Sequence, residues 1–149
     1  MVVRCRVTTP DRLIRDRGAV PAMLPPSPLS WEDESRRLEL PTTLDSVVTI
    51  RDRVLVVPRS IVEKIQATHP ADFASLERLG EVLDRWELVG LSPSRTGRLE
   101  LYARLDGIWH TAVIALATEA MPFSVLITFH RVYERKVLSR ERSGRLRRR

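Results

Sequence analysis

The chain has 149 residues, which suits one domain of ordinary size and excludes a two-domain enzyme with a separate nucleotide-binding half. Apolar residues make up 43% and charged residues 30%, a balance that predicts a packed core and excludes disorder along the whole chain. A single cysteine, Cys5, excludes a disulfide framework and a cysteine-based zinc site within one chain. No apolar run approaches the roughly 18 residues of a membrane helix, and the first residues lack the apolar stretch of a secretory signal. The sequence therefore predicts a cytoplasmic protein that makes no membrane contact.

The net charge of +6 is concentrated near the end of the chain. The segment 131–149 contains nine Arg or Lys and two Glu, so the other 130 residues are close to neutral. This segment is either a solvated basic tail, with its last residues disordered, or a sequence-independent clamp for phosphates.

Residues 1–45 differ in composition from the rest, because they hold six of the ten prolines. Proline removes a backbone donor and fixes φ, so this region resists both helix and central strand. We expect a short strand at Met1–Val7 and a short helix at Ser30–Leu40, within an arm or linker that is partly disordered.

The next region begins with β-branched residues. Val47–Ile50 and Arg53–Val57 predict a strand or a short hairpin that ends at Pro58. Ser60 and Glu63 have the spacing of a capping box, which predicts a helix from Ser60. Pro70 predicts that this helix ends near His69, because the residue before a proline is disfavoured in the α conformation.

A second helix is predicted from about residue 71 to Trp86. Its apolar residues recur at intervals of three and four, which is the period of one helix face. They are Phe73, Leu76, Leu79, Val82, Leu83 and Trp86.

The last third of the chain has a period of two. Arg98–Leu105 alternates, Asp106-Gly107 is a strong tight-turn signal, and Ile108–Ala117 predicts the returning strand. Phe123–Val132 predicts a third strand after a turn at Met121-Pro122.

Together these elements predict an α+β fold, since the helices and strands are segregated along the chain. Two helices are expected to pack on a three- to four-stranded antiparallel sheet, a meander. The predicted domain occupies residues 46–135, between the proline-rich arm at 1–45 and the basic tail at 136–149.

Several common catalytic motifs are absent from the sequence, including glycine-rich phosphate loops, HExxH and serine elbows. The spacing of the three histidines does not indicate a metal site, and no cofactor is predicted. His69 is expected at a helix end, where its side chain either faces a cleft or contacts the last carbonyls of the helix. One face of the predicted sheet, either solvated or a site, would carry Tyr102, Arg104, His110, Thr128 and His130.

Such a face has the groups that cleavage of RNA without a metal requires. Histidine suits the base and acid roles because its pKa lies near neutrality. Arginine suits the phosphate because its fork is planar and always charged. A threonine hydroxyl donates a hydrogen bond to a phosphate oxygen, and tyrosine stacks on a base.

Residues 54–132 resemble the barnase–EndoU–colicin–RelE class of small ribonuclease domains, in particular its branch from phages and mobile elements. The resemblance lies in a strand and helix ending in His-Pro (RSIVEKIQATHP) and a second, leucine-rich helix (FASLERLGEVLDRWELVG). Three strands follow, with a tyrosine (RLELYAR), a tryptophan (GIWHTAVIAL) and a threonine before an aromatic residue (FSVLITFHRVY). The resemblance implies helices on a four-stranded antiparallel sheet, metal-independent RNA cleavage and a toxin-like role with an immunity protein or antitoxin as partner.

By position, His69 matches the helix-end histidine of that class, Thr128 the hydroxyl of the last strand, and Arg98 or Arg104 the basic residue of the first meander strand. His130 has no matching position, so the acid and base are not assigned. We therefore predict a toxin-like endoribonuclease with His69, His130, Thr128 and Arg104 as catalytic residues and with Arg98, Tyr102 and Arg131 as residues that bind RNA. The alternatives are a non-catalytic nucleic-acid-binding module and a mobile-element accessory or interaction protein.

Overall fold

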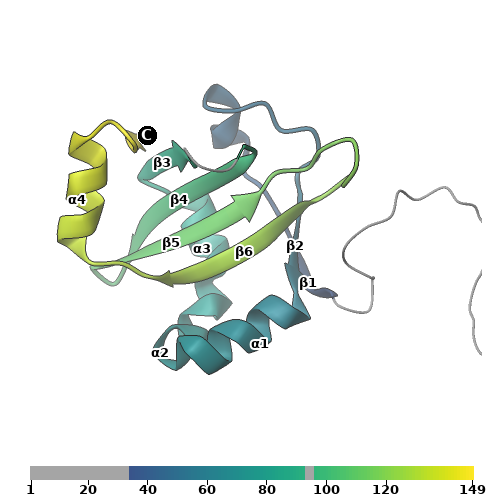
Figure 1. Ribbon diagram of the computed structural model, residues 1–149, viewed down its shortest axis with the longest axis horizontal. Helices are drawn as coiled ribbons and strands as arrows, with labels where there is room; N and C mark the ends of the chain where they lie inside the picture. The colour runs from purple at the N-terminus through teal and green to yellow at the C-terminus, as the bar shows by residue number, and fades with distance from the viewer. Residues whose placement is uncertain (1–33, 93–95) are drawn as a thin grey trace, which may run out of the picture.

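The computed structural model describes residues 34–92 and 96–149. The predicted strand at Met1–Val7 and the first 33 residues of the proline-rich arm lie outside this part of the chain. The described residues form an α+β fold, as predicted (Figure 1). The fold is built around one sheet, which is mixed rather than antiparallel as predicted.

The sheet has seven strands in the order β1-β2-β6-β5-β4-β3-β7. All neighbouring strands are antiparallel except β2 and β6, which are parallel. The strands are β1 (Glu34–Glu39), β2 (Val54–Pro58), β3 (Leu88–Leu91), β4 (Arg98–Leu105), β5 (Ile108–Ala115), β6 (Ser124–Arg131) and β7 (Arg147–Arg148). The sheet is therefore larger than the predicted three or four strands.

The predicted meander forms the centre of this sheet as β4, β5 and β6. Asp106 and Gly107 join β4 to β5 with φ values of 52° and 82°. Positive φ at both central residues is what the favoured hairpin turns with Asp-Gly require. The sequence therefore predicts this hairpin correctly, to the residue.

The helical region is more broken than predicted. The first helix, α1 (Arg59–Thr68), ends before His69 as expected. The predicted second helix is divided into α2 (Pro70–Phe73), a 3-10 helix (Ala74–Arg78) and α3 (Leu79–Asp84). Its apolar stripe is nevertheless correct from Leu76 to Trp86, because those side chains are buried in the main core.

The main core lies between these helices and one face of the sheet. It includes Ile65 of α1, Leu83 of α3 and the alternate β4 residues Leu99, Leu101 and Ala103. A smaller core on the opposite face joins α4 (Glu134–Arg142) to the sheet through residues that include Val137, Trp109 and Leu146. Figure 1 shows α1 and α2 below the sheet and α4 at its left end.

Four predictions about local structure are wrong. Residues 34–39, within the predicted helix Ser30–Leu40, form strand β1. The predicted strand Val47–Ile50 follows a 3-10 helix at 42–46 and is a loop whose apolar side chains pack on the core. Ser60 makes no capping box, because Pro58 still pairs with β1 and α1 begins directly after it, at Arg59. Phe73, placed on the buried stripe, is 37% exposed.

Both predicted domain boundaries differ from the structure. Leu40 and Leu44 belong to the predicted arm, yet both are in the main core. At the other end, residues 134–142 form α4 and residues 147–148 form β7, so this segment is not a solvated tail. β7 pairs with β3 at the edge of the sheet. The basic segment is thus part of the folded domain, because Val137 and Leu146 supply apolar contacts between its arginines.

Candidate functional site

Two histidines from distant parts of the chain meet at the edge of β6. The ring centroids of His69 and His130 are 5.6 Å apart, and the ring planes are inclined by 21°. His69 lies in the break between α1 and α2, where Pro70 ends the first helix and begins the second. His130 is near the end of β6, beyond the two residues of that strand that pair with β2. The edge of β6 beside His130 is therefore not covered by β2.

The two imidazoles have different surroundings. The His69 side chain is 47% exposed, and its Nδ1 lies 3.9 Å from Oδ2 of Asp72. His130 is half-buried, and burial lowers the pKa of His130, with a further lowering by the charge of His69. Nδ1 of His130 is buried and has no hydrogen-bond partner among the described residues. Nε2 of His130 is thus the nitrogen that remains to exchange a proton.

Asp72 and Arg131 form an ion pair next to the histidines. Nε of Arg131 donates to Oδ1 of Asp72 at 2.7 Å. The Asp72 side chain is 8% exposed, whereas the Arg131 side chain is 48% exposed. The terminal nitrogens of Arg131 make no hydrogen bond within the described part of the chain, so they remain available to an anion.

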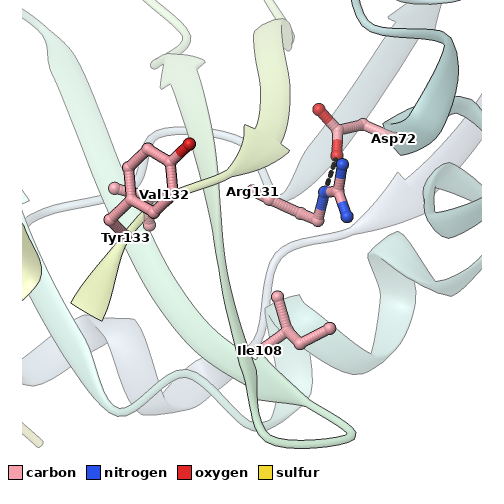
Figure 2. Close-up of a pocket in the computed structure, with 5 residues that line it drawn as sticks. All are labelled: Asp72, Ile108, Arg131, Val132 and Tyr133. Carbon is pink, nitrogen blue, oxygen red and sulfur yellow. Dashed lines mark hydrogen bonds and ion pairs between the residues drawn. The ribbon is translucent and has the colours of Figure 1, made fainter.

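A pocket with a volume of about 340 Å³ opens beside this ion pair. Figure 2 shows Asp72 and Arg131 on one side of it, Val132 and Tyr133 on the other, and Ile108 below. The sequence predicts Arg131 as a residue that binds RNA, but it gives no indication that Asp72 or Tyr133 lines a pocket. Asp72 lies in a short helix that begins with Pro70, and Tyr133 follows strand β6. Neither residue lies in a sequence pattern that marks a site.

His110 does not lie on the predicted face. It pairs with Arg131 across β5 and β6, whereas Thr111 pairs with His130, so Thr111 takes the place expected for His110. The His110 ring is buried, stacks on Phe129 at 5.6 Å, and has Nδ1 3.0 Å from the Ile108 carbonyl oxygen. Burial lowers the pKa of His110. This histidine belongs to the packed interior.

Tyr102 and Arg104 are also engaged in the fold. Tyr102 is 1% exposed, and its hydroxyl contacts Glu100 and Arg140, so its ring is not available to stack on a base. Burial raises the pKa of Tyr102, and the Glu100 carboxylate adds to that effect. Arg104 donates two hydrogen bonds to Glu87, at 3.0 and 2.7 Å, and stacks on Trp109. β5 separates it from β6, a backbone distance of roughly 10 Å.

The other two predicted residues differ in their relation to the histidine pair. Thr128 is half-buried and lies two residues before His130, on the same face of β6. Arg98 pairs with Ala115, which is roughly 14 Å along β5 from Thr111, the residue that pairs with His130. The structure therefore brings His69 next to His130, with Thr128 on the same face of β6, and links Arg131 to His69 through Asp72. It leaves Arg98 and Arg104 apart from them.

Comparison of the chain with protein-family models, with curated proteins and with solved structures finds no match. In the described residues, no helix has the length and apolar character needed to cross a membrane. Within residues 34–92 and 96–149, no three His, Cys, Asp or Glu side chains converge as metal ligands would.

Proposed function

We propose that this protein cleaves RNA without a metal ion, with His69 and His130 as the two groups that transfer protons. The observation that carries the proposal is the pairing of the two imidazoles, 5.6 Å apart at a part of the β6 edge that β2 does not cover, near the exposed arginine that Asp72 holds. An acid and a base must each come within roughly 2.6–3.2 Å of their oxygens, and one phosphodiester group can reach both rings at this separation. The resemblance to small ribonuclease domains supports the same class of reaction.

The different surroundings of the two rings assign their roles. His130, whose pKa burial lowers, is the base and accepts the proton of a ribose 2′-hydroxyl on Nε2. The 2′-oxygen forms a bond to the adjacent phosphorus, and the bond from phosphorus to the 5′-oxygen breaks. His69, whose Nδ1 lies 3.9 Å from the Asp72 carboxylate, is the acid and donates a proton to the departing 5′-oxygen. The products are a 2′,3′-cyclic phosphate and a 5′-hydroxyl, and solvent resets both histidines.

Arg131 and Thr128 have supporting roles in this proposal. The terminal nitrogens of Arg131 stabilise the negative charge that develops on the phosphate oxygens. Asp72 orients that guanidinium by accepting from its Nε at 2.7 Å. Thr128 donates its hydroxyl hydrogen to a phosphate oxygen from the same face of β6.

The test is cleavage of a labelled RNA in EDTA by the wild type and by the His69→Ala and His130→Ala variants. We expect the wild type to produce 2′,3′-cyclic phosphate ends, and each variant to lose roughly 100-fold or more in rate. His110→Asn is the matched control: it changes the third histidine, keeps an N–H donor for the Ile108 carbonyl, and leaves the rate unchanged. Equal rates in all four proteins, or products with other ends, contradict the proposal.

The strongest alternative is a non-catalytic nucleic-acid-binding module. It is favoured by four basic residues of the C-terminal segment whose side chains make no ion pair or hydrogen bond among the described residues, namely Arg135, Lys136, Arg142 and Arg147. This alternative predicts RNA binding that falls with salt, no cleavage, and unchanged affinity in His69→Ala.

The toxin-like role and its immunity protein or antitoxin are part of the same proposal. They predict that the wild type stops the growth of the cells that express it, whereas His130→Ala is expressed freely. Co-expression of the partner would restore growth without a change in the chain itself.

A further inference from the structure

The pocket beside the histidine pair has an unusual apolar wall. Tyr133 is 79% exposed and Ile108 is 47% exposed, and both line the pocket. Large apolar side chains normally pack inside a domain, and a group of them rimmed by charged residues marks a binding surface. Tyr133 is the N-cap residue of α4, but its side chain makes no capping hydrogen bond there. Tyr133 is therefore free to contact a ligand.

The opposite wall of the pocket is polar and connects it to the proposed reaction centre. Asp72 contacts Arg131 through one carboxylate oxygen and approaches His69 with the other, at 3.9 Å. Asp72 therefore lines the pocket and also approaches His69 of the histidine pair. Arg131 lines the same pocket, and Figure 2 shows its guanidinium beside the Asp72 carboxylate.

This combination has the chemistry of a nucleotide site. An aromatic ring stacks on the face of any base, and an arginine with unpaired terminal nitrogens binds the attached phosphate. Ile108 offers a second apolar contact to the base edge. The exposed cation across the pocket from the ring favours a ligand that is both flat and anionic, which an apolar peptide or a neutral small molecule is not.

We propose that this pocket binds the nucleobase next to the phosphate that is cleaved, with Tyr133 stacked on the base and Arg131 on its phosphate. The proposal rests on the proposed RNA cleavage for the position of the cleaved bond, but the base site itself can be tested by binding alone. Because stacking on a ring is tolerant of sequence, the site is expected to accept all four bases.

The experiment measures binding of a short, fluorescently labelled 2′-O-methyl RNA, which lacks the attacking hydroxyl and is not cleaved. An abasic oligonucleotide of the same length is the second probe. We expect Tyr133→Ala to weaken binding of the 2′-O-methyl RNA by roughly fivefold to a hundredfold and to leave binding of the abasic strand unchanged. Tyr133→Phe keeps the ring and is expected to bind both probes as the wild type does.

Leu91→Ala is the matched control, because Leu91 is 52% exposed on β3 and does not line the pocket. Equal affinity of Tyr133→Ala and the wild type for the 2′-O-methyl RNA overturns the base site, even if the histidine variants abolish cleavage. An equal loss of affinity for both probes also overturns it, since the ring would then not be reading a base. If no RNA is cleaved but the Tyr133 result is as expected, the base site stands and the proposed reaction fails.

Discussion

Burial lowers the pKa of His130, and the nearby charge of His69 lowers it further. In NMR titrations of the histidine ring protons, we therefore expect His130 to titrate below the ordinary value of about 6.5. Replacing His69 with Gln removes the second effect but not the first, so the pKa of His130 should rise and still remain below that value. A pKa of His130 that does not change in His69→Gln would contradict the electrostatic coupling of the two rings.

His110 makes the stability of the fold depend on pH. Burial lowers the pKa of His110, so below about 6.5 the unfolded chain binds a proton that the folded chain does not. The free energy of unfolding should therefore be highest above that pH and fall as the pH drops through it toward the lower pKa of the folded state. Because His130 adds to the same effect, His110→Asn should reduce this loss without removing it. Urea unfolding at several pH values measures the difference between the two proteins.

For single residues, the sequence predicts where a side chain lies in the fold better than it predicts what that side chain does. His69 is placed correctly because Pro70 fixes where the helix ends, and His130 because alternation places it beyond Thr128 on one face of β6. The side of the sheet that His110 occupies depends on the register between β4 and β5, in which Tyr102 pairs with Thr111. That register is set by the Asp106-Gly107 turn, and a shift of one residue exchanges the two faces.

The attachment of α4 and the C-terminal segment to the sheet involves a buried polar network. Glu100 is 7% exposed, accepts from Arg145 at 2.6 Å and from the Tyr102 hydroxyl at 3.2 Å. Glu100→Gln removes the charge from a site closed to water, and we expect a loss of about 2 kcal/mol in the free energy of unfolding. The exposed pair of Arg148 with Glu141 is the control, and Glu141→Gln should cost less than Glu100→Gln. Chemical denaturation of the two variants, monitored by circular dichroism, makes the comparison.

Gly90 allows the C-terminal segment to pack closely against strand β3. A Cβ atom at this position would lie 2.6 Å from the Arg145 carbonyl oxygen and 2.8 Å from Leu146, so the backbone of β3 approaches that segment as closely as glycine allows. We expect Gly90→Ala to displace Leu146, which is 2% exposed, and to lower the melting temperature. Gly97→Ala is a poor control because φ is 80° there, whereas Gly80→Ala, with only one contact at 3.9 Å, should be tolerated.

Elements with a strong period or turn are predictable from this sequence, and the short or charged strands toward the two ends of the sheet are not. The β4–β5 hairpin has both signals and is found as predicted. β3 has four residues that include a glycine, and β7 has two arginines, so neither has a pattern of its own. β1 contains the charged run Glu-Ser-Arg-Arg, which suits a solvated strand edge as well as it suits a helix. These strands form because partners elsewhere in the chain offer them hydrogen bonds.

Across the whole molecule, some basic side chains of the C-terminal segment are paired within the fold, and others face solvent without a partner among the described residues. Arg140, Arg145 and Arg148 contact Tyr102, Glu100 and Glu141, respectively. Four basic residues make no ion pair or side-chain hydrogen bond in the described chain and remain to attract a polyanion: Arg135, Lys136, Arg142 and Arg147. If RNA lies along them, replacing all four with Gln should reduce the slope of log affinity against log salt by roughly 0.7 for each phosphate that the variant no longer neutralises. Arg148→Gln, whose side chain is paired, should leave that slope unchanged.

The parallel junction in the sheet links the site to local opening of the fold. β2 pairs with β6 only at Leu55 with Ser124 and Val56 with Val125, whereas β4 and β5 pair along eight residues. His69 and Asp72 follow β2 in the chain, and His130 and Arg131 belong to β6, so the site extends across a backbone junction of only two paired residues on each strand. Amide hydrogens at this junction should exchange with solvent faster than those between β4 and β5. A nucleic acid that contacts both sides would slow that exchange, because binding only the closed form stabilises it.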